Sequence, residues 1–212
     1  MTLIAGKPSP RTVKATLDPR SWKELVCVLK TGDENERLHA ALAMGAYPAS
    51  ATLLVEQLPR ETAISVRRAI LDTLMRLDAP AAIRGLTDYL RCEHVALRNE
   101  VIEVLRALGA RGDRGSAMAP VLTTLLADPD PDLRIFAVNI LESVRHPHVE
   151  QWLIDAIERD QQVNVCAAAL DLLCKMGTEA ATEPLLRLKA RFPSEAYIQF
   201  AADLALQRIR ES

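Results

Sequence analysis

The sequence predicts an all-α fold, a right-handed α-superhelix (solenoid) of about six helix pairs packed side by side. Three observations predict it: the composition, a unit that repeats every 30 to 36 residues, and apolar residues at helical spacing in each unit. Of the 212 residues, 49% are hydrophobic but only 4% are aromatic. Alanine and leucine dominate, which favours closely packed helices over a β-sandwich, because sheets are enriched in β-branched and aromatic residues.

The first residues and the cysteines of the chain limit the classes of protein to which it can belong. Residues 1–18 are expected to form a loosely ordered N-terminal arm, and residues 19–212 a single repeat domain. The first residues do not form a secretion signal, and no run of about 18 apolar residues predicts a membrane span. The four cysteines lie in apolar helical patterns, as buried thiols do in a reducing compartment. We therefore expect a cytoplasmic protein with no membrane partner.

The second helix of each pair carries the repeat. If Leu133 is the first position of the second helix in the fourth pair, equivalent first positions recur along the chain. They are Glu36, Val66, Leu97, Val165 and Tyr197. The fifth positions are Ala40, Ile70, Val101, Ala137, Ala169 and Ala201, and the ninth are Met44, Leu74, Leu105, Leu141, Leu173 and Ala205. These positions lie on one side of a helix and predict its buried stripe.

A first helix precedes each second helix. Eleven residues before the first positions stand Leu25, Val55, Leu86, Leu122, Ile154 and Leu186. The predicted pairs span residues 20–47, 49–78, 80–109, 115–145, 148–177 and 179–210. Asp130 is expected to cap a helix that begins with Pro131, and Gly109 and Gly177 are expected to end helices in a left-handed conformation. One pair cannot bury its apolar side alone, so stacked pairs form a continuous core.

The stretch "LLADPDPDLRIFAVNILESV", residues 125–144, resembles the HEAT repeats of the short bacterial, phycobilisome-lyase type. Arg37, Arg67, Arg98 and Arg134 fill the second position of that pattern. The resemblance implies that such an arginine bonds an acidic turn residue and ties repeats together, with Asp130 or Asp132 as the partner of Arg134. Cys166 and Ile198 occupy this position in the fifth and sixth copies, so the row of pairs is expected to fail there. The architecture serves many roles and by itself names no function.

The resemblance also implies that the second helices line a concave face. Their third, seventh and tenth positions lie away from the apolar stripe. The seventh positions are Leu42, Asp72, Glu103, Asn139, Asp171 and Asp203, of which four are acidic. Arg68, Arg76 and Arg106 lie nearby and partly offset this charge. Two interpretations remain open: an ordinary solvated surface, or a groove for a partner segment with basic or amide-rich side chains.

The candidate site therefore comprises Asp72, Glu103, Asn139, Asp171, Asp203, Arg68, Arg76 and Arg106. A net charge of −2 and a pI of about 6.1 do not favour nucleic acid as the partner. The connection 109–118, "GARGDRGSAM", is the longest between pairs, and it is either a contact element or a tolerated insertion.

Motifs for catalysis are missing from the sequence. It contains no GxGxxG, P-loop, GxSxG or HExxH pattern, and its four histidines suggest neither a triad nor a metal cluster. We expect no catalytic residue, metal or cofactor, and a non-catalytic adaptor that binds a protein or peptide. Two alternatives are a regulatory or chaperone-like subunit of a modifying enzyme, as the phycobilin lyases are, and a self-assembling element. The apolar residues of "AADLALQRIRES" favour the latter, so a monomer or weak homodimer is expected.

Overall fold

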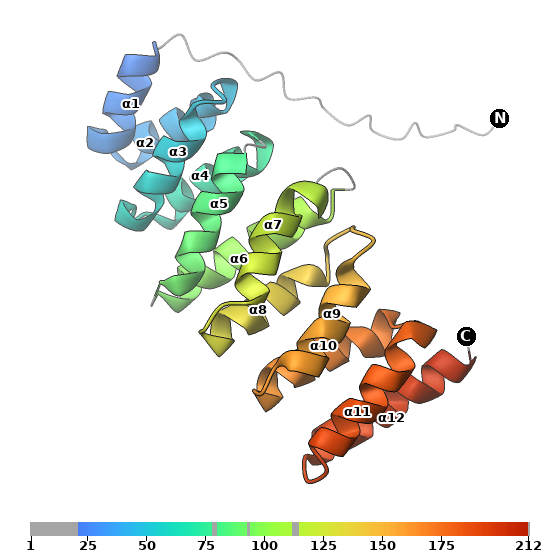
Figure 1. Cartoon of the computed structure of the whole chain (residues 1–212). Helices are drawn as coiled ribbons and strands as arrows, with labels where there is room; N and C mark the ends of the chain where they lie inside the picture. Colours follow the sequence, from blue (N-terminus) through green and yellow to red (C-terminus); the bar gives the residue numbers. More distant parts are fainter. Residues whose placement is uncertain (1–20, 78–79, 93, 112–114, 212) are drawn as a thin grey trace, which may run out of the picture.

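The structure, a computed structural model, describes residues 21–77, 80–92, 94–111 and 115–211. Over these residues the regular secondary structure is entirely helical, as predicted (Figure 1). The helices are α1 (Trp22–Thr31), α2 (Glu34–Ala43), α3 (Ser50–Gln57), α4 (Ile64–Leu77), α5 (Pro80–Asp88), α6 (Val95–Gly109), α7 (Gly115–Leu126), α8 (Pro131–Leu141), α9 (Val149–Arg159), α10 (Val163–Met176), α11 (Thr182–Arg191) and α12 (Ala196–Glu211). Short 3-10 turns follow α2, α3 and α5 and precede α11. The predicted N-terminal arm lies outside the described residues.

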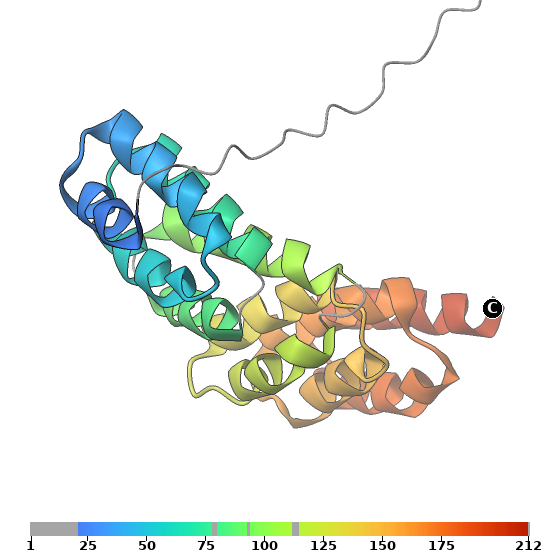
Figure 2. The same cartoon turned by 90° about the horizontal axis from the view of Figure 1, so that it is seen from above.

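The helices form six pairs stacked in two layers (Figures 1 and 2). The odd-numbered helices are the first helices of the pairs, and the even-numbered ones are the second helices. Each second helix packs on the next, from α2 on α4 to α10 on α12, and each pair contacts its neighbours along the chain. Figure 2 shows that the rod bends, with the second helices on the inner side of the bend. The predicted α-α solenoid is therefore confirmed.

Local signals fix several helix starts. Ser21 with Glu24 and Asp33 with Glu36 form capping boxes at α1 and α2, so the first backbone N–H groups find acceptors. Asp130 accepts from the backbone N–H of Asp132 with Pro131 as the first helical residue, as predicted.

The expected left-handed glycine caps are wrong. Gly177 has φ −60° and ψ 143°, which is extended backbone, and Gly109 still belongs to α6. A side chain at Gly109 would lie 2.6 Å from Val144 Cγ2, so close packing explains that glycine.

The predicted apolar stripe forms the core in the first five pairs, except that Glu36, the expected first position of the first copy, is exposed. The residues at the fifth and ninth positions are all buried, from Ala40 and Met44 to Ala169 and Leu173. Small alanines in this stripe let neighbouring helices approach closely. None of the described helices is long and apolar enough to cross a membrane.

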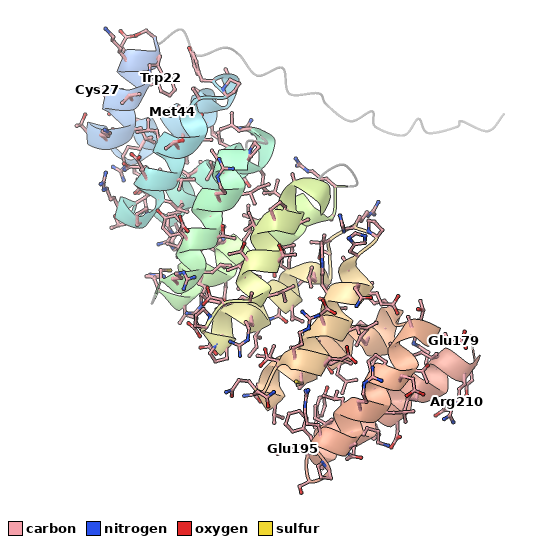
Figure 3. All side chains as sticks on the ribbon, in the orientation of Figure 1. Trp22, Cys27, Met44, Glu179, Glu195 and Arg210 are labelled. Carbon is pink, nitrogen blue, oxygen red and sulfur yellow. The ribbon has the colours of Figure 1, made fainter. Side chains whose placement is uncertain are left out.

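The sixth pair departs from the predicted register by one residue. Tyr197, the expected first position, is 52% exposed, whereas Ile198 is fully buried. After the turn at residues 192–195, which includes Glu195 (Figure 3), α12 begins at Ala196, so its third residue is Ile198, as Val165 is the third residue of α10. The first position is therefore Ile198, and the buried fifth and ninth positions are Ala202 and Leu206. The predicted residues Ala201 and Ala205 are buried as well. Leu186 is also exposed, so its predicted place in the core is wrong.

Buried ion pairs join successive pairs of helices. Arg37 of α2 donates to both carboxylate oxygens of Glu61, at 2.9 and 2.8 Å, and Arg134 of α8 does the same to Asp160, at 2.6 and 3.0 Å. The side chains of Glu61 and Asp160 are only 2% and 8% exposed. Each acid belongs to the turn of the following pair, so the arginine ties two repeats together. The partner of Arg134 is thus Asp160, and the expectation of Asp130 or Asp132 is wrong.

The turn acids Glu61, Asp128 and Asp160 share one repeat position, five residues before the first position. Each also accepts from the backbone N–H two residues later, at distances of 2.9 to 3.0 Å. Burial raises the pKa of Glu61, but the hydrogen bonds from Arg37 and Ala63 outweigh it and hold the pKa below its usual value. The pKa of Asp160 is lowered for the same reason, against its own burial.

The arginine–acid pairing differs in the third, fifth and sixth copies of the repeat. Arg98 bonds the Cys92 carbonyl and lies over the Phe136 ring, while Asp128 pairs with Arg91 instead. In the fifth copy Cys166 donates to the Asp160 carbonyl, and Arg191 of the next repeat reaches back to the Cys166 sulfur. In the sixth copy the second position holds Gln199 rather than Ile198. Its amide donates to the carbonyls of Lys189 and Phe192, so it ties the turn as the arginines do.

Candidate binding surface

We call the solvent-facing side of the second-helix layer, built from positions three and seven of each second helix, the inner face. The helix pairs place these residues there because the opposite side of each second helix packs on its first helix. All the predicted seventh-position residues are exposed, from Leu42 to Asp203. With the corrected register, however, the seventh position of the sixth copy is Leu204, and Asp203 points away from the row. Asp203 pairs with Lys189 on α11.

A shallow depression of about 460 Å³ lies on the inner face between α4 and α6. Arg68, Asp72 and Glu103, three of the predicted site residues, line it together with Leu71, Asn99, Glu100 and Val104. Within the described chain, Arg68 and Asp72 carry no hydrogen bond or ion pair from their side chains. The depression therefore presents one cation and one anion that are not paired within the described chain, beside Glu100 and Glu103, which pair with Arg67 and Arg106.

The other cations of the inner face are held by the protein itself. Arg106 donates to Glu142 at 2.8 Å, and Lys175 donates to the same carboxylate at 2.6 Å. The Lys175 hydrogen bond is the main reason that the pKa of Glu142 is lowered. Arg76 donates to Thr73 at 2.9 Å and to the Leu42 carbonyl at 3.3 Å. Arg76 and Arg106 therefore link neighbouring repeats, which leaves Arg68 as the more accessible of the predicted arginines.

The C-terminal part of the inner face is apolar, which sequence reasoning missed. Tyr197, Phe200 and Leu204 of α12 are 52%, 68% and 51% exposed. The Tyr197 hydroxyl donates to Asp171 of α10. The apolar pattern of α12 alone fits both registers, and the start of α12 at Ala196 decides between them. Asn139 lies between this region and the middle of the face, exposed on α8.

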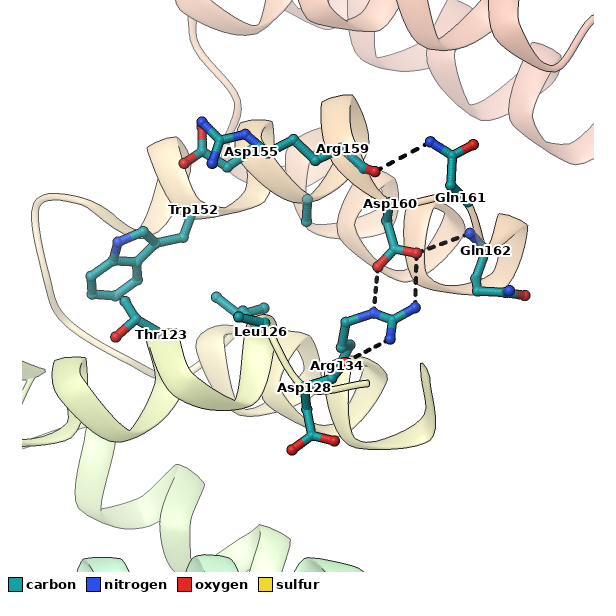
Figure 4. A pocket seen from close by; sticks show the side chains of 12 residues that line it. Thr123, Leu126, Asp128, Arg134, Trp152, Asp155, Arg159, Asp160, Gln161 and Gln162 are labelled. Carbon is teal, nitrogen blue, oxygen red and sulfur yellow. Dashed lines mark hydrogen bonds and ion pairs between the residues drawn. The ribbon is translucent and has the colours of Figure 1, made fainter. Parts of the chain in front are cut away.

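A second concavity of about 490 Å³ lies on the other layer, between α7 and α9 (Figure 4). Trp152 and Thr123 lie at one end of it, the Arg134–Asp160 pair lies at the other, and Leu126 lies between them. The Trp152 ring stacks on His146 with the centroids 4.8 Å apart. Sequence reasoning did not predict this groove, because it forms between helices far apart in sequence.

The described residues hold no group of three or more His, Cys, Asp or Glu side chains placed to bind a metal ion. His146 and His148, two residues apart in sequence, pack against each other and against Trp152. Burial raises the pKa of the thiols of Cys166 and Cys174, which disfavours the reactive thiolate there. The described surface therefore presents side chains that can contact a partner molecule.

The family model for HEAT repeats matches residues 118–207. The match covers 90 of the 212 residues. The helix pairs before residue 118 continue the same stacking of second helix on second helix. None of the curated proteins compared with the chain matches it.

Several solved structures are similar to the chain at low sequence identity. An archaeal HEAT-like repeat protein from Thermococcus onnurineus NA1 has 19% identity and a TM-score of 0.47, over 88% of this chain and 86% of that one. An engineered protein has 15% identity and a TM-score of 0.48, over 90% and 98%. The CpcE–CpcF complex of phycocyanin lyase from Nostoc sp. PCC7120 has 18% identity and a TM-score of 0.36, over 95% and 100%.

Proposed function

We propose that this HEAT-repeat protein is a non-catalytic scaffold that holds a segment of another protein along its inner face. The observation that carries the proposal is the depression between α4 and α6. It presents Arg68 and Asp72 without internal partners, beside Glu103 and above a partly apolar floor. Unpaired charges that converge on a concavity suit polar recognition, because a ligand can satisfy them without first breaking internal bonds.

The charge of the inner face indicates the side chains that a partner would bring. Asp72, Glu103 and Asp171 are exposed acids along one row, while Arg106 and Lys175 are held by Glu142. A segment that places lysine, arginine or amide side chains over these acids gains favourable contacts, and an acidic residue can meet Arg68. Such contacts contribute orientation and specificity more than affinity.

Site-directed crosslinking tests the proposal. A photoreactive amino acid at position 99, in the depression, is compared with one at position 159, beside the groove of the other layer. Crosslinked proteins from native lysate are identified by mass spectrometry. We expect one protein to be captured from position 99 and not from position 159, at a defined segment of its sequence.

Charge-reversal variants test which layer binds the partner, and Arg159→Glu on the other layer is the matched control. The double variant Asp72→Lys and Glu103→Lys should weaken binding of that purified partner at least tenfold, whereas Arg159→Glu should leave it unchanged. Both variants change exposed side chains, so the circular dichroism spectrum should stay the same. A partner that binds the double variant normally but loses binding with Arg159→Glu would place function on the other layer. Capture from neither position would refute the proposal.

A further inference from the structure

Three large apolar side chains form one exposed patch at the C-terminal end of the inner face. Tyr197, Phe200 and Leu204 are spaced by three and four residues on α12, so they lie on the same side of that helix. At least half of each side chain is exposed. We call these three residues the α12 patch. At the third and seventh positions of the middle repeats, the structure places Arg68, Asp72, Asn99 and Glu103 instead.

Stacking of one more repeat beyond the sixth would not cover the α12 patch. The side of each second helix that packs on the following repeat carries the sixth position, which is Ala41, Leu71, Ile102, Val138 and Leu170 in the first five copies, all buried. In the sixth copy this position is Asp203, exposed and paired with Lys189. At this position the last repeat is thus polar, and the exposed apolar residues of α12 face the inner side of the bend.

An acid borders the α12 patch on the side of the preceding repeat. Asp171 of α10 accepts a hydrogen bond from the Tyr197 hydroxyl through one carboxylate oxygen, and this bond orients the ring. The nearest lysine of α10, Lys175, is held by Glu142. A ligand that covers the patch therefore meets an apolar strip with negative charge at its inner edge.

The size of the α12 patch favours a short segment over a second copy of the chain. Two aromatic residues and one leucine, which are 51% to 68% exposed, offer roughly 350 Å² of surface. A stable dimer buries about 800 Å² on each partner. One amphipathic helix of a few turns, in contrast, covers such a strip with apolar side chains at positions i, i+3 or i+4, and i+7.

We propose that the α12 patch and Asp171 bind a short amphipathic helix of a partner protein. Three apolar side chains of this helix pack on Tyr197, Phe200 and Leu204, and a lysine or arginine at one end of it pairs with Asp171. The inference rests on the proposed scaffold function and names the chemistry of the partner at this end of the inner face.

A displayed library of random 16-residue peptides tests this assignment. It is selected on the wild-type protein, with removal of peptides that bind the double variant Phe200→Ser and Leu204→Ser. We expect the enriched peptides to share large apolar residues at helical spacing with a flanking lysine or arginine. Absence of enrichment, or enrichment of peptides without this pattern, would overturn the inference.

Two further measurements test the role of Asp171 and the oligomeric state of the protein. By fluorescence anisotropy, Asp171→Asn should weaken the best basic peptide at least fivefold and leave a version with neutral flanks unchanged. Equal binding of both peptides to both proteins would overturn the role of Asp171. In sedimentation velocity the wild type should stay monomeric. A dimer that the double serine variant abolishes would assign the patch to a second copy and overturn the inference.

These outcomes separate the two proposals. If the middle of the inner face binds its partner through Asp72 and Glu103 while the serine variant has no effect on any peptide, only the α12 assignment fails. If peptides select the α12 patch but charge reversal in the middle changes nothing, the scaffold function must be moved to the C-terminal end.

Discussion

Replacing Arg134 by methionine should show how strongly one buried ion pair couples successive repeats. The guanidinium makes two hydrogen bonds to Asp160, and one each to the carbonyls of Asp128 and Pro129, at 2.7 and 3.1 Å. Both side chains are mostly buried, at 14% and 8% exposure. In Arg134→Met the Asp160 carboxylate keeps only the backbone N–H of Gln162 as a close partner.

The expected loss follows from that geometry. Removing one member of a buried ion pair typically costs about 3–5 kcal/mol, because the other charge is left uncompensated. The bond from Gln162 and some access of water reduce this, so we expect a loss of about 3 kcal/mol in the free energy of unfolding. The double variant Arg134→Met and Asp160→Asn removes both charges and should recover roughly half of the loss.

Urea unfolding monitored by circular dichroism gives the change in stability, and hydrogen exchange locates it. Because repeats are coupled mainly to their neighbours, exchange should accelerate most in α9 and α10, which follow the broken pair. Arg187→Met is the matched control, since Arg187 also pairs with an acid of another repeat, Glu158, but is 59% exposed. Its loss should stay within about 1 kcal/mol. Equal effects of both methionine variants would refute the reasoning.

Three further outcomes follow from the packing. The pKa of Glu61 is lowered in the folded state. Its contribution to stability is therefore present above its pKa in the unfolded chain, about 4.3, and is lost as the pH falls through the pKa of the folded state. Glu61→Gln should flatten the pH dependence of the urea midpoint below about pH 4.3. Gly85→Ala should cost about 1–3 kcal/mol in thermal unfolding, because its Cβ would lie 2.5 Å from Val55 Cγ1. Exposed Cys27 should react with iodoacetamide in the folded protein, and buried Cys166 only after unfolding, as peptide mass spectrometry can show.

Local sequence was enough for the helices and for most of the core. Apolar spacing at the first, fifth and ninth positions identifies the buried side of most second helices, as at Ile70, Val101 and Ala137. In the sixth pair the third residue of α12 is Ile198 and not Tyr197, and a shift of one residue rotates the pattern by about 100°. That rotation replaces Asp203 by Leu204 on the inner face, and it is the reason that the α12 patch was not predicted.

Local sequence was not enough to predict which residues of neighbouring repeats interact. Arg134 was recognised from its place in the repeat, but the choice between the nearby Asp130 and Asp132 and the more distant Asp160 depends on how one pair stacks on the next. The groove between α7 and α9 likewise exists only after stacking. The sequence by itself determined an all-helical stack of about six pairs, because helical periodicity is a property of neighbouring residues. The tertiary structure decided which charges are paired, which face is apolar and where the surface is hollow, because these depend on the relative rotation of helices that the chain brings together.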